Sequence, residues 1–430
     1  MSFSVMGLIA AALMIALFHP LVGLLAFLSL IYLRIQDIAP ELMGPFSLNM
    51  IGVVTLAGWL IQRQQSVSLP SQIFLLAGFL LASTLSLAHL SMDVIKAAIP
   101  DLLSKAFFVW LIINIVTTKH AAKAYIWCWL LLTTSLAVWI TYQTSILDNS
   151  EYLYKDRTQY FGIFADPNDL ALAYILMLPV AYYVISQART LWVRGLAAFS
   201  FLSIAYATTT TLSRGAFVAV LAAVPVIFVR DRRRATAFIL LVLLLGVLDP
   251  YIPSSFWARV ESIEYNNPGQ SAVQRIAAWE AGQQMFLDHP LLGVGKDQFL
   301  QHHVRAAHSA YFQVAAETGL FGLTFWVLLI AWTFKELYRV GSLARNHPEV
   351  ADLELYAKGL EAGFVAFLVG AVFLSQAYSW LLFSFIGIAA ALRQVADAAI
   401  MPQQSAADPK PTLAYPDRSP AVRSFLGGSS

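Results

Sequence analysis

Apolar runs of about 20 residues recur along most of this 430-residue chain, and they constrain its fold more than any other feature. A helix of about 20 residues crosses the roughly 30 Å hydrocarbon layer of a membrane and satisfies its backbone polar groups internally. The runs are continuous and do not alternate with a period of two residues, which argues against a transmembrane β-barrel. Charged residues make up 12% of the chain, against about 25% in a soluble domain. We therefore expect an all-α polytopic membrane protein.

The runs predict about 12 transmembrane helices, of which the last two are either separate spans or one tight hairpin. The expected spans are residues 4–33, 46–62, 71–90, 98–117, 122–143, 168–187, 191–207, 214–230, 236–251, 309–334, 359–377 and 379–396. The expected division is nine spans in residues 1–251, a large external loop with amphipathic helices in 252–307, three spans in 308–396 and a disordered Pro- and Ser-rich tail in 397–430.

Short basic connections indicate the orientation, because Lys and Arg are retained on the cytoplasmic side of a membrane. The densest cluster is Arg230, Arg232, Arg233 and Arg234, which we assign to the cytoplasm. With twelve spans, the other basic connections fall on the same side and both termini are cytoplasmic. The large loop then lies on the opposite face, together with the polar segment before residue 168.

Several classes of site are excluded by composition. The single cysteine, Cys128, lies in an apolar run and allows neither a disulfide framework nor a cysteine metal site. His302, His303 and His308 lack the i, i+4 spacing of a zinc helix, and there is no phosphate-binding loop or GxSxG motif, so we expect no metal and no cofactor. The net charge of +2 gives no indication of nucleic-acid binding. No Lys or Arg precedes Arg34, so the first span is expected to be retained rather than cleaved as a signal peptide.

Two arginines are candidates for anion binding. Arg214, in TTTTLSRGAF, lies at the external mouth of a span, where an arginine is costly and its planar fork suits a phosphate. Arg275, in SAVQRIAAWEAGQQMFLDHPLLGVG, lies on a predicted amphipathic helix on or over the membrane surface. The alternatives are that Arg214 extends to lipid headgroups, and that Arg275 is solvated or pairs with Glu280.

A histidine is the candidate for proton transfer. His308 begins the span at residues 309–334, and a neutral imidazole there accepts a proton from a hydroxyl; the alternative is an interfacial or capping role. Glu317 lies nine residues further on, about 180° around a regular helix, so the two do not form a simple dyad on one face. We expect Glu317, with Thr318 and Gly319, to kink the helix and to pair with an arginine of another span.

Other polar residues are candidates for substrate binding. In KDRTQYFGIFADPNDLALAY, Lys155 and Arg157 add positive charge on the external face. Residues 166–168 read as a turn and helix cap before the next span. We count the following as substrate-binding candidates beside the two arginines: Lys155, Arg157, Asn168, Arg305 and Glu317.

Four segments, taken together and in order, resemble the O-antigen ligase superfamily, which includes O-antigen ligases, O-antigen polymerases and bacterial O-oligosaccharyltransferases. They are FADPNDLALAYILMLP, TTTTLSRGAFVAV, QRIAAWEAGQQMFLDHPLLGVGKDQF and HSAYFQVAAETGLFGL, within Tyr160–Leu329. The resemblance implies a GT-C-like glycosyltransferase of the bacterial inner membrane, with Arg214, Arg275 and His308 as its functional residues.

The resemblance also implies a reaction. A glycan would move, without metal, from an undecaprenyl diphosphate carrier to an acceptor hydroxyl at the periplasmic face, and in-line displacement predicts inversion. We expect a monomer that contacts membrane lipids. Many family members have His-Asn where this chain has His308-Ser309, which leaves the acceptor open between lipid A–core, a growing chain and a protein. The alternative from another class is a transporter or flippase, which needs polar residues through the midplane.

Overall fold

The computed structural model describes residues 13–38, 48–62, 66–230 and 270–407, and these are almost entirely helical. The described α-helices are α2 (Pro20–Leu33), α3 (Ile35–Ile38), α5 (Leu48–Gln62), α6 (Ser71–Ser86), α7 (Met92–Ile115), α8 (Lys119–Ser145), α9 (Pro167–Ile175), α10 (Leu178–Gln187), α11 (Leu191–Thr210), α12 (Arg214–Arg230), α15 (Gln270–Asp288), α16 (Phe299–His302), α17 (Ala310–Asn346), α18 (Glu354–Gly370) and α19 (Trp380–Ala407). Short 3₁₀ helices are η1 (Ser150–Tyr152), η2 (Gly162–Phe164) and η4 (Pro348–Leu353), and a hairpin pairs β1 (Leu153–Tyr154) with β2 (Arg157–Thr158).

Six helical segments of the described chain are long and apolar enough to cross a membrane. They are α7, α8, the α9–α10 segment, α11, α17 and α19, and the shorter apolar helices α2, α5 and α6 accompany them. The all-helical, multi-pass prediction is confirmed in this coarse form, while the count of twelve stays a prediction. The expected span 236–251 and part of the expected loop lie outside the described residues. α19 extends to Ala407, so it continues into the expected tail.

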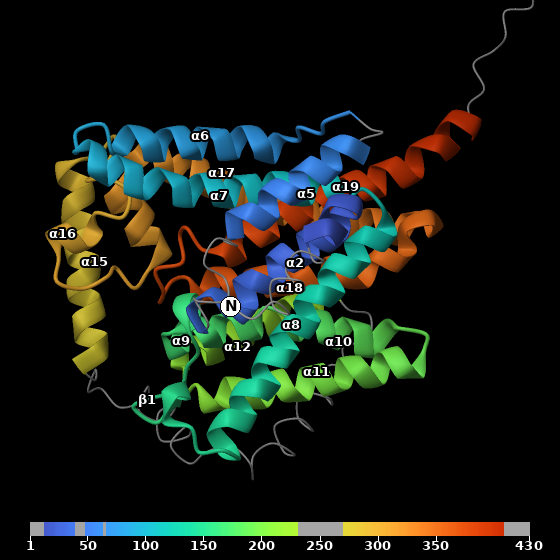
Figure 1. Cartoon of the computed structure of the whole chain (residues 1–430), viewed down its shortest axis with the longest axis horizontal. Helices are drawn as coiled ribbons and strands as arrows, with labels where there is room; N and C mark the ends of the chain where they lie inside the picture. Colours follow the sequence, from blue (N-terminus) through green and yellow to red (C-terminus); the bar gives the residue numbers. More distant parts are fainter. Residues whose placement is uncertain (1–12, 39–47, 63–65, 231–269, 408–430) are drawn as a thin grey trace, which may run out of the picture.

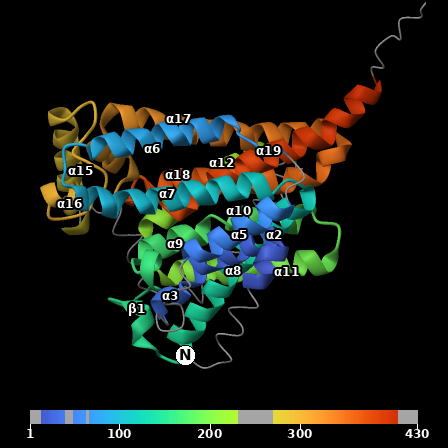
Figure 2. The same cartoon turned by 45° about the horizontal axis from the view of Figure 1, so that its top comes forward.

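The helices form a bundle with one helix lying across its end (Figures 1 and 2). α6, α7 and α17 run side by side, and α17 packs against α6, α18 and α19, while α18 also packs against α10 and α12. α15 lies across the end of this bundle, roughly perpendicular to α17, which it contacts. A helix in this position lies parallel to the membrane plane if the bundle crosses the membrane. The helix predicted around Arg275 is present as α15, while its place on the membrane surface stays a prediction.

Ion pairs hold basic residues from two of the connections that the sequence assigns to the cytoplasmic face. Arg230, at the end of α12, pairs with Glu361 of α18 at 2.7 Å, and both side chains are buried. Lys123 of α8 pairs with Asp352 of η4 at 2.5 Å. These contacts gather the basic connections at one end of the bundle, as the predicted orientation requires. The side of the membrane itself stays a prediction.

α17 is broken at Gly319, which has φ 60° and ψ −163°, as the sequence predicted for this region. The loop after α15 pairs with the broken segment through its backbone. The bonds run from Val294 N to Ala316 O at 2.9 Å, from Gly295 N to Glu317 O at 3.0 Å and from Leu320 N to Pro290 O at 2.8 Å. The insertion that carries Arg275 is therefore attached to the helix that follows His308.

Replacing Gly319 by alanine is expected to destabilise the protein by about 1–3 kcal/mol, because this backbone conformation is accessible essentially only to glycine. A Cβ at Gly319 would also lie 2.4 Å from the backbone carbon of Leu291. Thermal unfolding in detergent measures the loss, and limited proteolysis of the insertion reports its detachment. Gly195→Ala is the control, since its Cβ would meet nothing within 4 Å. Equal melting temperatures for the two variants would contradict this account.

Candidate active site

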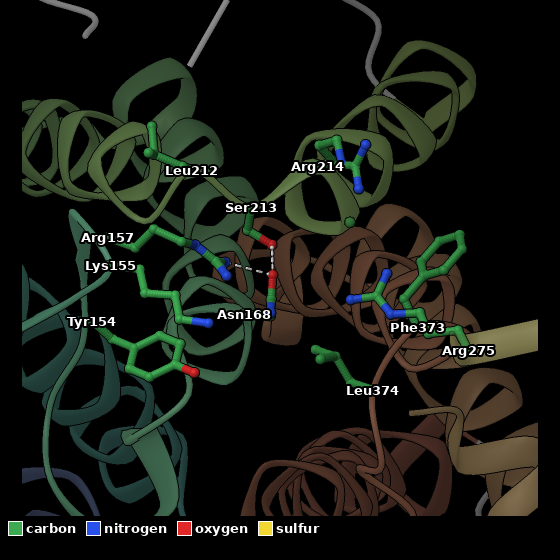
Figure 3. Close-up of a pocket in the computed structure, with 11 residues that line it drawn as sticks. Tyr154, Lys155, Arg157, Asn168, Leu212, Ser213, Arg214, Arg275, Phe373 and Leu374 are labelled. Carbon is green, nitrogen blue, oxygen red and sulfur yellow. Dashed lines mark hydrogen bonds between the residues drawn. The ribbon is translucent and has the colours of Figure 1, made fainter. Parts of the chain in front are cut away.

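A cavity of about 430 Å³ opens where five parts of the chain meet (Figure 3). Its lining comes from the β1–β2 hairpin, α9, the start of α12, α15 and the loop after α18. The residues are Tyr154, Lys155, Arg157, Asn168, Leu212, Ser213, Arg214, Gly215, Arg275, Phe373 and Leu374. The predicted residues Lys155, Arg157, Asn168, Arg214 and Arg275 are therefore brought together at one cavity, although they are widely separated in the sequence.

The hairpin brings Arg157 to the cavity and fixes its side chain. Lys155 and Asp156 form a two-residue turn with φ values of 49° and 63°, the positive values that a type I′ hairpin turn requires. Strand β2 then returns toward α9. The Arg157 guanidinium donates to Thr211 O at 2.8 Å and to Asn168 Oδ1 at 2.8 Å.

Asn168 connects the hairpin to the start of α12. Asp166 is the N-cap of α9, and its carboxylate accepts from the backbone N–H of Asn168 at 2.7 Å, which confirms the predicted cap. The Asn168 side-chain amide also donates to Asp166 at 2.8 Å. Its carbonyl oxygen accepts from both Arg157 and the Ser213 hydroxyl, the latter at 2.9 Å (Figure 3). Arg157 and the residue before Arg214 are thus held by one amide.

Arg214 and Arg275 reach the cavity from different helices and influence each other electrostatically. Arg214 is the first residue of α12, and Arg275 lies half-buried on α15. Burial lowers the pKa of the Arg275 guanidinium below its usual value, the charge of Arg214 lowers it further, and Asp166 acts in the opposite direction. Arg275 forms no ion pair with Glu280 in the described structure, which removes that alternative. Clustered cations of this kind favour a polyanionic ligand.

His308 lies beside this group of charges but does not line the cavity. It is half-buried and has a left-handed backbone, with φ 44°. Burial lowers the pKa of His308 below its usual 6.5; the charges of Arg275 and Arg305 lower it further, and Asp166 raises it. The imidazole is therefore neutral at pH 7 and able to accept a proton.

The other two candidates lie away from the cavity lining. Arg305 is exposed in the loop before α17 and acts on His308 through its charge. Glu317 is buried in α17, where its carboxylate accepts from the backbone N–H of Phe299 at 3.4 Å. The expected pairing of Glu317 with an arginine is wrong for the described residues, since its charged neighbours there are Lys296 and Asp297.

The loop between α18 and α19 is the part of the site that the sequence did not reveal. The predicted spans 359–377 and 379–396 left no room for it, because the apolar residues after Gly370 continue the hydropathy of the span. In the structure α18 ends at Gly370 and α19 begins at Trp380, so residues 371–379 form a connecting loop. Phe373 and Leu374 of this loop line the cavity. The polar stretch SQAYS was the available signal.

A family model described as O-antigen ligase matches residues 198–327. The resemblance inferred from the sequence is confirmed over this stretch, which contains Arg214, Arg275 and His308. The hairpin, Asn168 and the loop 371–379 lie outside the match. No curated protein matches the chain.

Proposed function

With an O-antigen ligase domain as the premise, we propose that this protein transfers a glycan from undecaprenyl diphosphate to an acceptor hydroxyl at the periplasmic face of the bacterial inner membrane. The proposed acceptor is lipid A–core, as in lipopolysaccharide maturation. One observation carries the proposal: Lys155, Arg157, Arg214 and Arg275 line one cavity beside a histidine whose pKa is lowered.

The cavity has the two kinds of surface that a lipid diphosphate needs. The cationic side chains supply charge and bidentate hydrogen bonds for phosphate oxygens. Among the described residues that line the cavity none is acidic, so the lining carries a net positive charge. Leu212, Phe373 and Leu374 supply apolar contact for the first hydrocarbon units of the carrier. Gly215 lies beside Phe373, whose side chain a Cβ at this position would contact at 3.6 Å, and the absence of a side chain lets the ligand approach the start of α12.

The chemistry is a single displacement at the anomeric carbon of the donor sugar. His308 accepts the proton of the acceptor hydroxyl while its oxygen forms a bond to that carbon. The bond from the anomeric carbon to the phosphate oxygen breaks, and its electron pair leaves with the lipid diphosphate. Arg214 and Arg275 stabilise the negative charge that develops on this leaving group. Attack opposite the leaving group gives inversion, and the cations take the charge-stabilising role without a metal ion.

The pH dependence of transfer tests the state of His308. A base with a lowered pKa is neutral above that pKa and becomes protonated only when the pH falls through it. We therefore expect the acid limb of kcat/KM to have its midpoint below pH 6.5, the ordinary value for histidine. Arg305→Gln removes one nearby positive charge and should move the midpoint upward, toward 6.5. A midpoint above 6.5 in the unmodified protein would contradict this assignment.

The test of the function is transfer by purified protein in lipid vesicles. Lipid-linked donor is supplied with lipid A–core, with further donor, or with a protein acceptor, in the presence and absence of a chelator. Glycosylated lipid A–core, formed equally well with chelator, is the expected result. Elongated donor or labelled protein would support the proposed reaction but identify a different acceptor. No transfer to any acceptor would overturn the proposal.

A lipid-linked glycan transporter is the second candidate. The observation that favours it is the pair formed by Lys105 and Asp101 at 2.5 Å in α7, because charged residues within spans often mark transport pathways. The same vesicles distinguish the two candidates. Movement of labelled donor across the bilayer without any glycosylated product would favour the transporter.

A further inference from the structure

The start of α17 depends on another part of the chain for its capping. Its N-cap residue, Ser309, makes no side-chain capping hydrogen bond. The first helical N–H, that of Ala310, donates instead to Ala371 O at 2.9 Å, and the His308 N–H donates to the Ser375 hydroxyl at 2.9 Å. The left-handed conformation of His308 is unfavourable for a residue other than glycine. The loop 371–379 thus holds His308 in a backbone conformation that is unfavourable by itself.

The loop is in turn fixed from α9. The Gln376 side-chain amide donates to a carboxyl oxygen of Asp169 at 2.7 Å, a hydrogen bond between residues far apart in the sequence. A second contact holds the same loop, because the Trp326 indole donates to Ala377 O at 3.1 Å. Gln376 directly follows Ser375. The position of the Gln376 side chain therefore governs the position of the Ser375 hydroxyl, which accepts the hydrogen bond from the His308 N–H.

Asp169 is adjacent to the residue that organises the cationic side of the cavity. Asn168 holds Arg157 and Ser213, whereas Asp169 holds Gln376. Successive residues of a helix project about 100° apart, so one turn of α9 reaches both sides of the site. The first turn of α9 therefore fixes the position of the histidine relative to the cations of the cavity.

We propose that Asp169 and Gln376 are positioning residues that, through Ser375, set the place of His308 relative to the cavity arginines. This inference rests on the proposed function. Neither side chain lines the cavity, so neither is expected to touch substrate. Their effect is on the distance and direction from the imidazole to the acceptor hydroxyl, to which catalysis is sensitive because a displacement of about 1 Å costs on the order of 100-fold.

Gln376→Leu tests the pair by removing the hydrogen bond at similar side-chain size. The kcat for transfer, counted per donor-binding site, is expected to fall by about 10–100-fold, whereas the Kd for lipid-linked donor stays within about twofold. Counting per donor-binding site removes the effect of any unfolded fraction. A merely structural role would lower the number of sites and leave kcat per site unchanged. Gln301→Leu, the same change at an exposed position of α16, is the matched control.

The exchange Asp169→Asn with Gln376→Glu keeps the hydrogen bond and reverses its direction. We expect this double variant to recover kcat to within about threefold of the unmodified protein, since such a bond needs one donor and one acceptor, whichever of the two residues supplies each. Ser375→Ala should lower kcat per site as Gln376→Leu does, and Ser375→Thr, which keeps the hydroxyl, should not.

Two results would overturn the inference while leaving the proposed function in place. One is unchanged kcat per site in Gln376→Leu, in a preparation where the unmodified protein transfers and His308→Ala does not. The other is an exchange variant that binds donor normally and is no more active than Gln376→Leu. Absence of transfer by the unmodified protein would refute the proposed function itself, and this inference with it.

Discussion

Transfer by His308→Ala is expected to be lower than that of the unmodified protein by about 10²–10⁴-fold, the range that a positioned general base contributes. The imidazole is half-buried and its pKa is lowered, so at pH 7 it is the neutral proton acceptor that the acceptor hydroxyl requires. The residue lies outside the cavity lining, so the affinity for lipid-linked donor should change little. The rate of transfer in vesicles and the Kd for donor measure the two effects separately.

His302→Ala is the matched control for this variant, because His302 lies in the same insertion with its ring exposed and bonded to Gln298 O. It should keep near-normal transfer. The small remaining activity of His308→Ala should also lose the acid limb of the pH profile, since the titrating group is gone. Retention of a tenth or more of the activity, with the acid limb unchanged, would assign the proton transfer to another group.

The sequence predicted the helical membrane class because hydropathy reports directly on transfer to a hydrocarbon layer. It was less informative about where helices end or break. The predicted span 309–334 is part of α17, which continues to Asn346 because polar residues can continue a helix beyond the apolar run that hydropathy detects. The predicted span 168–187 is divided into α9 and α10 around Met177, immediately before Leu178 and Pro179.

The candidate site was predicted as a set of residues but not as a geometry. Arg214 and Arg275 were each identified by the cost or amphipathic pattern of their own segment, and only tertiary packing brings their charges together. The hairpin that carries Arg157 escaped prediction, because its strands are two residues long and its turn contains no glycine. The loop with Ser375 and Gln376 was hidden by the apolar residues before it.

One physical reason underlies these gaps. Periodicity and hydropathy report which face of a single segment is buried or lies in lipid. Asn168 and Asp169 instead act by hydrogen bonding to segments that are distant in the sequence. Asn168 was a candidate only as part of a cap and polar patch. Its bonds to Arg157 and Ser213, and the bond of Asp169 to Gln376, are what give the site one frame.

Arg214→Ala and Arg275→Ala are each expected to reduce transfer by about 10²–10³-fold, the cost of removing one preorganised group that stabilises developing negative charge. Donor affinity should fall as well, because both guanidinium groups line the cavity. The control for loss of positive charge is Arg189→Ala. Arg189 is exposed before α11, and the predicted orientation puts it on the cytoplasmic side. Near-normal transfer by either cavity variant, with folding intact, would refute its assigned role.

Arg275→Lys separates charge from geometry. Lysine keeps the positive charge but presents a compact ammonium in place of the planar fork, so it makes no bidentate contact with phosphate. If Arg275 grips the leaving diphosphate through paired hydrogen bonds, Arg275→Lys should recover only a small part of the activity lost in Arg275→Ala. Full recovery by lysine would show that charge alone is needed. Because burial and Arg214 already disfavour a cation at this position, an anionic ligand should relieve that cost and bind more weakly as salt increases.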